Sequence, residues 1–146
     1  MRWLLGVLLI ALGLSACGES TEDKYKEGFP PIDRGLVALG DDVATALREA
    51  GESGDRALAA ELSRYSRRLG GLRERLDRLE APSTLAKDHA ALLGATAAVR
   101  EALRDVATAA RAGDATAARD AATRLVRAGA RLEEIRSKVA RAARRL

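Results

Sequence analysis

The two residue types that most often carry chemistry, cysteine and histidine, each occur once, as Cys17 and His89. A zinc site needs three or four ligands from His, Cys and carboxylates, and ferritin-like di-iron bundles need a Glu-x-x-His motif on each of two helices. Position 86, three residues before His89, is Ala86, and no Cys-x-x-Cys-His motif for haem occurs. The sequence therefore predicts no metal centre and no cofactor.

The sequence also offers few residues that could carry out nucleophilic catalysis. No serine lies in a Gly-x-Ser-x-Gly context, and a single histidine leaves almost no way to assemble a nucleophile–base pair. The neighbouring acids Asp41-Asp42 and Glu133-Glu134 would point in different directions on a helix. We expect no enzyme. For His89 we expect a partly buried side chain bonded to a carbonyl or carboxylate, with a pH-sensitive role or a metal ligand as alternatives.

The first 17 residues have the order of an export signal. A positive start at Arg2 precedes an uncharged apolar run from Trp3 to Ala16. Fourteen residues of helix span only ~21 Å, short of the ~30 Å hydrocarbon core of a bilayer. Such a short run behind a positive start is typical of a secretory signal rather than of a membrane span.

The run ends in Leu14-Ser15-Ala16-Cys17, which resembles the lipobox of bacterial lipoproteins. The resemblance implies that residues 1–16 are a signal peptide, that a peptidase recognises Leu14, Ser15 and Ala16, and that Cys17 carries a diacylglycerol. Several acyl chains, at ~0.8 kcal/mol per buried methylene, make a stable membrane anchor. We therefore expect the protein to be lipid-anchored on the extracytoplasmic face of the cell membrane, away from nucleic acid. In Gram-negative lipoproteins an Asp after the cysteine favours retention at the inner membrane. This chain has Gly18 there, so the outer membrane is a further location if the source is Gram-negative.

The remaining chain predicts a tether and then four helices. Residues 17–32 hold the lipidated cysteine and a polar stretch that ends in Pro30-Pro31, a linker composition. Apolar residues then recur at spacings of 4 and 3 within ranges of about 33–50, 55–80, 83–112 and 114–146. The expected buried seam of the first helix includes Gly40, and Ser83 is the expected cap of the third helix. The expected seam of the third helix consists of Leu85, His89, Leu92, Thr96, Val99, Leu103, Val106 and Ala110. Short connections at 51–54, 81–82 and 113–114 force neighbouring helices to be antiparallel. The expected fold is all-α: an antiparallel up-down-up-down four-helix bundle over residues 33–146. The heptad stays in phase across Gly70-Gly71, so we expect one second helix, kinked or straight at this point, rather than two short helices.

The mature chain also resembles a group of small, uncharacterised lipoproteins of high-GC actinobacteria. The residues that carry the likeness are Tyr25 to Ile32, Leu39-Gly40, Leu79 to Pro82, Leu85, His89 and Leu92, and Ala112 to Asp114. The resemblance implies a lipobox, a short tether and a helical domain, and it implies no activity.

Charge is divided unevenly along the chain. Residues 19–61 carry eleven acids and five bases, a net −6, whereas residues 62–146 carry ten acids and nineteen bases, a net +9. Five cations near the C-terminus have no acid among them: Arg136, Lys138, Arg141, Arg144 and Arg145. They either complement the dipole of the last helix or rest on anionic head groups, where each is worth roughly 1 kcal/mol.

These features predict a non-enzymatic, membrane-anchored cell-envelope module. We expect a structural or protein-interaction role in which a helix face or the membrane-distal end meets another envelope protein. The alternative is a small-ligand binding or sensor domain that uses the bundle interior, where Ala110, Ala118 and Ala121 could either pack closely or leave a cavity. A connected apolar cavity of a few hundred Å³ would favour the ligand-binding alternative.

Overall fold

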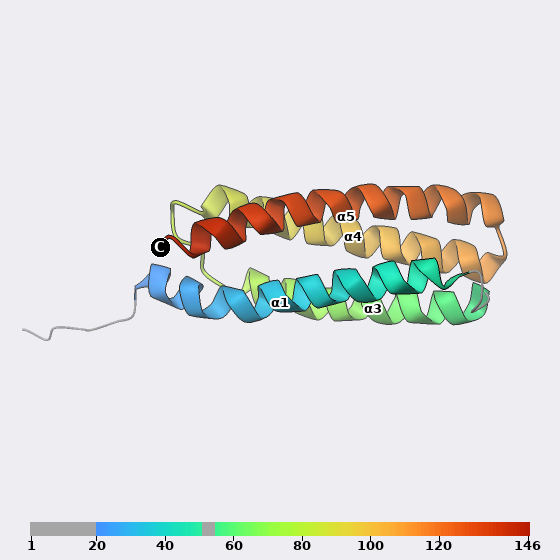
Figure 1. The fold of residues 1–146 in the computed structure, drawn as a ribbon, viewed down its shortest axis with the longest axis horizontal. Helices are drawn as coiled ribbons and strands as arrows, with labels where there is room; N and C mark the ends of the chain where they lie inside the picture. The colour runs from blue at the N-terminus through green and yellow to red at the C-terminus, as the bar shows by residue number, and fades with distance from the viewer. Residues whose placement is uncertain (1–19, 51–54) are drawn as a thin grey trace, which may run out of the picture.

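The computed structural model describes residues 20–50 and 55–146, and these residues form an all-α fold of four helices that lie lengthwise beside one another (Figure 1). The helices are α1 (Thr21–Arg48), α3 (Asp55–Asp77), α4 (Ala86–Ala112) and α5 (Ala115–Ala143). The predicted signal peptide, Leu14, Ser15, Ala16 and Cys17 lie outside the described residues, as does the predicted connection at 51–54.

Helix α1 begins at Thr21, so the prediction that the tether reaches residue 32 was wrong. The Ser20 side chain accepts a hydrogen bond from the backbone N–H of Asp23 at 3.1 Å, and acids follow in the first turn, which is how a helix start is stabilised. Pro30 and Pro31 lie inside the helix rather than before it. Each proline removes one backbone donor. The carbonyls four residues earlier belong to the exposed Lys26 and Glu27, where water can replace the lost partners.

The buried side of α1 explains why the helix continues through the prolines. Its buried residues follow a spacing of 4-3-4-3 and are Tyr25, Phe29, Ile32, Leu36 and Leu39. Tyr25 and Phe29 are 0% and 1% exposed, and their rings stack with centroids 5.5 Å apart. Burying two aromatic side chains against the other helices outweighs the two lost hydrogen bonds.

The other helix boundaries match the predictions more closely. Gly113 ends α4 in the left-handed conformation at φ 67°, and the Asp114 side chain caps α5 by accepting from the Ala117 N–H at 2.9 Å. The expectation that Ser83 caps the third helix was wrong, because α4 begins after Leu85. Helix α3 runs without a break through Gly70 and Gly71, as expected.

Contact between helices is unequal around the bundle. Helix α4 packs extensively on α3 and α5, α1 packs on α3, and α1 and α5 contact each other least. Glycines allow close contacts along α1. A Cβ atom at Gly35 would lie 2.6 Å from Leu72 Cδ2 of α3, and one at Gly28 would lie 2.7 Å from Leu79 Cδ1, just beyond the end of α3. Because each leucine occupies the space that a side chain would take, these glycines let α1 lie close to α3 and to the segment that follows it.

Candidate functional site

An apolar groove opens between α1 and α5, and we call it the α1–α5 groove. Its volume is about 540 Å³. Leu69 of α3 and Val99 and Leu103 of α4 form its floor, while Val37 and Val126 stand at its mouth. Leu69 and Leu103 are 1% and 0% exposed, whereas Val37 and Val126 are 41% and 64% exposed. The groove therefore runs from solvent into the middle of the bundle.

Small residues produce this groove. Gly40 and Ala44 line it from α1, and Gly129 and Ala130 line it from α5. A Cβ atom added at Gly40 or Gly129 would meet nothing within 4 Å. The sequence had suggested that Gly40 is part of the buried seam of the first helix, but it is exposed, because the buried side of α1 passes through Leu36 and Leu39. With α1 held close to α3, the side chains that face α5 at this level are too short to fill the remaining space.

An ion-pair cluster lies at the end of the groove nearest the C-terminus of α5. The Arg136 guanidinium donates to Asp33 of α1 and to Glu133, in each case at 2.5 Å, and its side chain is only 14% exposed. The hydrogen bonds that Arg136 donates to Glu133 raise the pKa of Arg136 and lower the pKa of Glu133. The cluster therefore stays charged and joins α1 to α5 where their other contacts are few.

The same cluster changes the interpretation of the basic C-terminus. Arg136 is occupied by Asp33 and Glu133, and Lys138 Nζ lies 2.7 Å from Asp88 Oδ1 of α4. Contact with head groups was one of the two alternatives for these residues, and both side chains form ion pairs within the bundle. Arg141, Arg144 and Arg145 are exposed, and no described acidic side chain pairs with any of them.

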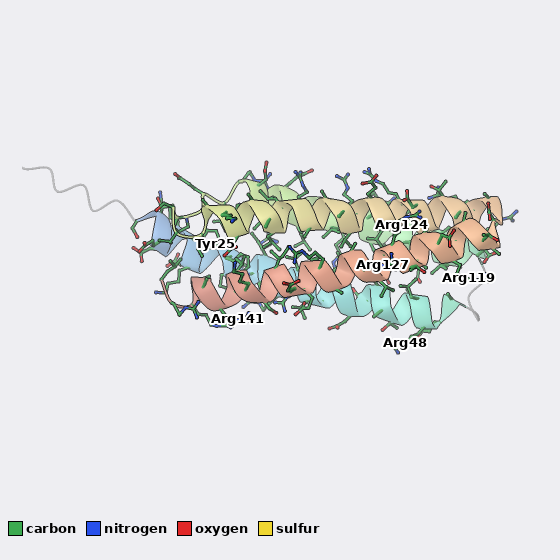
Figure 2. The ribbon with its side chains drawn as sticks, turned by 90° about the horizontal axis from the view of Figure 1, so that it is seen from above. Tyr25, Arg48, Arg119, Arg124, Arg127 and Arg141 are labelled. Atoms are coloured by element: carbon green, nitrogen blue, oxygen red, sulfur yellow. The ribbon has the colours of Figure 1, made fainter. Side chains whose placement is uncertain are left out.

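The single histidine lies in a buried aromatic cluster near the starts of α1 and α4. Tyr25 Oη and His89 Nδ1 are 3.0 Å apart, and the two rings meet edge to face (Figure 2 labels Tyr25). Burial lowers the pKa of His89, although Asp77 and the Leu76 carbonyl act in the opposite direction, and burial raises the pKa of Tyr25. In the tautomer whose Nε2 carries the proton, the neutral imidazole accepts from the tyrosine hydroxyl through Nδ1. His89 is therefore buried, as predicted. Its partners are the Leu76 carbonyl, which is of the predicted kind, and the Tyr25 hydroxyl, which is not.

The described part of the chain gives no further chemical site. Within residues 20–50 and 55–146, no three residues among His, Cys, Asp and Glu are grouped so that they could hold a metal ion. None of the described helices is both long and apolar enough to cross a bilayer. The strongest candidate for a binding site is therefore the α1–α5 groove. The sequence had placed a possible cavity at Ala110, Ala118 and Ala121, and none of these three residues lines the groove.

Comparison of the chain with protein-family models, with curated proteins and with solved structures finds no match.

Proposed function

We propose that this protein is a lipoprotein, anchored through Cys17 on the extracytoplasmic face of the cell membrane, whose non-enzymatic helical domain binds an apolar ligand in the α1–α5 groove. The groove is the observation that carries the proposal. Its volume of about 540 Å³ falls within the range of small-molecule sites, which often lie between the helices of bundles. This favours the ligand-binding alternative over a filled core that serves only as a scaffold.

The up-down-up-down arrangement of the bundle forms part of the proposal. Asp88 near the start of α4 pairs with Lys138 near the end of α5, and Asp105, later in α4, pairs with Arg124, earlier in α5. Pairs whose numbers run in opposite directions support antiparallel neighbours. In that arrangement the groove follows the long axis of the molecule and is bounded at one end by the Arg136 cluster.

The shape of the groove suits a single acyl chain. Between Leu36 and Leu47 of α1 the groove spans eleven residues, or about 16 Å of helix. A hydrocarbon chain with ~1.5 Å bonds advances about 1.3 Å per carbon, so about twelve carbons would fit. Burying ~12 methylenes contributes roughly 10 kcal/mol, and association costs at least ~4 kcal/mol. The remaining ~6 kcal/mol corresponds to a dissociation constant on the order of tens of micromolar.

A matched pair of glycine substitutions tests ligand binding. Both Gly129 and Gly71 lie inside helices with open space at the Cβ position, but only Gly129 lines the groove. We expect Gly129→Leu in the full chain to weaken saturable binding of a fluorescent twelve-carbon fatty acid at least tenfold, and Gly71→Leu to leave it unchanged. Absence of saturable binding, or equal binding by both variants, would refute the ligand proposal.

The anchor is tested separately. Mass spectrometry of the protein isolated from its producing cell should find a mature N-terminus at residue 17 that carries diacylglycerol, and Cys17→Ser should abolish both the lipid and the cleavage. An unmodified N-terminus on the wild-type protein would exclude the anchor.

A protein partner is the second candidate. The exposed valines at the groove mouth favour it, because the apolar side chains of a partner helix could enter from the side. Crosslinking from position 126 in the native envelope distinguishes the two candidates. A discrete protein adduct supports a partner, whereas recovery of lipid alone supports the ligand.

A further inference from the structure

The outward side of α5 carries a line of cations. Arg119, Arg127 and Arg141 of α5, and Arg145 just beyond its end, are exposed and are paired with no described acidic side chain. The intervals of 8 and 14 residues between the first three are close to two and four helical turns, so these three arginines share one side of α5. Figure 2 shows three of them, Arg119, Arg127 and Arg141, spread along the length of α5.

Few acids offset these cations. Helix α5 contains Asp120, Glu133 and Glu134, and the last two already pair with Arg136 and Arg131. The end of the bundle at which α1 begins is different, because exposed Glu22, Asp23 and Glu27 counterbalance the cations there. The positive surface of the domain is therefore the long side of α5 rather than the end of the bundle.

Apolar exposure occurs on the same part of the molecule. Val126, the most exposed large apolar side chain among the described residues, adjoins Arg127, and Val37 stands across the groove mouth on α1. Cations beside apolar side chains are typical of helices that lie in the plane of a membrane interface.

We propose that this surface, defined by Arg119, Val126, Arg127, Arg141, Arg144 and Arg145 and called the α5 face, rests on an anionic lipid bilayer. The inference rests on the proposed anchor at Cys17. It adds an orientation: the bundle lies along the membrane, and the mouth of the α1–α5 groove meets the head-group region, from which an acyl chain can enter. The partner is a lipid surface rather than an acidic protein, because the five cations of this face, with Arg119 and Arg141 about 33 Å apart along α5, surround only isolated valines and no compact apolar patch.

An upright bundle would separate the groove from its source of ligand. From Thr21 to Leu36 the helix rises about 22 Å, so an upright domain would hold the groove beyond the head groups. Lying on the α5 face removes that separation. Each cation near an anionic surface shifts the balance between the two orientations by a factor of about five, which corresponds to roughly 1 kcal/mol.

The test measures the depth of two labels in the full lipidated chain, reconstituted in vesicles with and without anionic phosphatidylglycerol. A fluorophore is placed at Val126→Cys on the α5 face or at Gly71→Cys on α3, where the new side chain meets open space. Nitroxide head-group lipids should quench the label at 126 at least fivefold more than the label at 71, and only in anionic vesicles. A triple variant, Arg119→Gln/Arg127→Gln/Arg141→Gln, should shift the orientation by about a hundredfold toward upright and abolish the difference.

A second triple variant controls for loss of charge alone. Arg64→Gln/Arg67→Gln/Arg75→Gln removes three exposed cations from α3 and should leave the quenching unchanged. Equal quenching at positions 126 and 71, or no effect of the α5 substitutions, would overturn the orientation. Labels that stay unquenched on a chain that still floats with the vesicles would also overturn the orientation, but they would leave the anchor intact. A chain that does not float with vesicles would overturn the anchor and the orientation together.

Discussion

The buried pair formed by Tyr25 and His89 predicts how the stability of the domain depends on pH. Because burial lowers the pKa of His89, the unfolded chain binds a proton more readily than the folded chain. The free energy of unfolding should therefore be highest above the ordinary histidine pKa of about 6.5. It should fall as pH decreases through the lower pKa of the folded state, with a slope of at most about 1.36 kcal/mol per pH unit for one proton.

Urea unfolding at pH 8, 7, 6 and 5, followed by circular dichroism, measures this slope. The window lies above the range in which Glu133 titrates, because its pKa is lowered from 4.5. His89→Gln keeps a polar side chain of similar size and removes the titration, so its unfolding free energy should be nearly constant between pH 8 and 5. Tyr25→Phe removes the hydroxyl that His89 Nδ1 accepts from and should cost about 1–3 kcal/mol at pH 8. A wild-type stability that does not fall below pH 6.5, or the same slope in His89→Gln, would refute the assignment of the proton to this pair.

Two further predictions concern the contacts of α1. Arg136→Ala leaves Asp33, whose side chain is only 21% exposed, without its partner and should destabilise the domain by about 1.5–3 kcal/mol, whereas Arg131→Ala, at 65% exposed, should change stability by less than ~0.5 kcal/mol. Thermal melting of both variants checks this, and equal losses would show that the cluster does not join α1 to α5. Gly35→Leu places a side chain in the space that Leu72 fills, so Leu72 or α1 must shift, and it should cost about 1–3 kcal/mol; at Gly40 an added Cβ meets nothing within 4 Å, so Gly40→Leu should not destabilise the domain. A Gly35→Leu domain as stable as the wild type would mean that the close approach of α1 and α3 is not needed.

Much of the helical arrangement could be predicted because the apolar spacings of 4 and 3 continue without interruption through the second and third predicted helices. Every residue proposed for the seam of the third helix, from Leu85 through His89 and Leu103 to Ala110, is buried. The start of α1 was missed because Pro30-Pro31 favours a linker. The opposing signals were present in the sequence: Ser20 three residues before Asp23 indicates a capped start, and Tyr25 and Phe29 begin a repeat that continues to Leu39.

The groove could not be predicted, because it depends on distances between helices rather than on the pattern along any one of them. Gly35 and Gly28 let α1 lie close to α3 and to the segment that follows it, while Gly40 and Gly129 leave the opposite side unfilled. In the sequence these four glycines look alike. Two of them face a leucine and two face open space, and only the packed structure distinguishes them.

With the proposed anchor at Cys17, the early start of α1 would limit how far the domain can act from the membrane. Three residues lie between Cys17 and Thr21, and the four Cα–Cα steps, at about 3.5 Å each, span at most ~14 Å. A tether to residue 32 would have allowed about 50 Å. The bundle itself is about 44 Å long, from the 29 residues of α5. A domain with the proposed anchor would search a thin layer over the membrane, where local lipid is concentrated, and would bridge no distance greater than about 58 Å to any second surface.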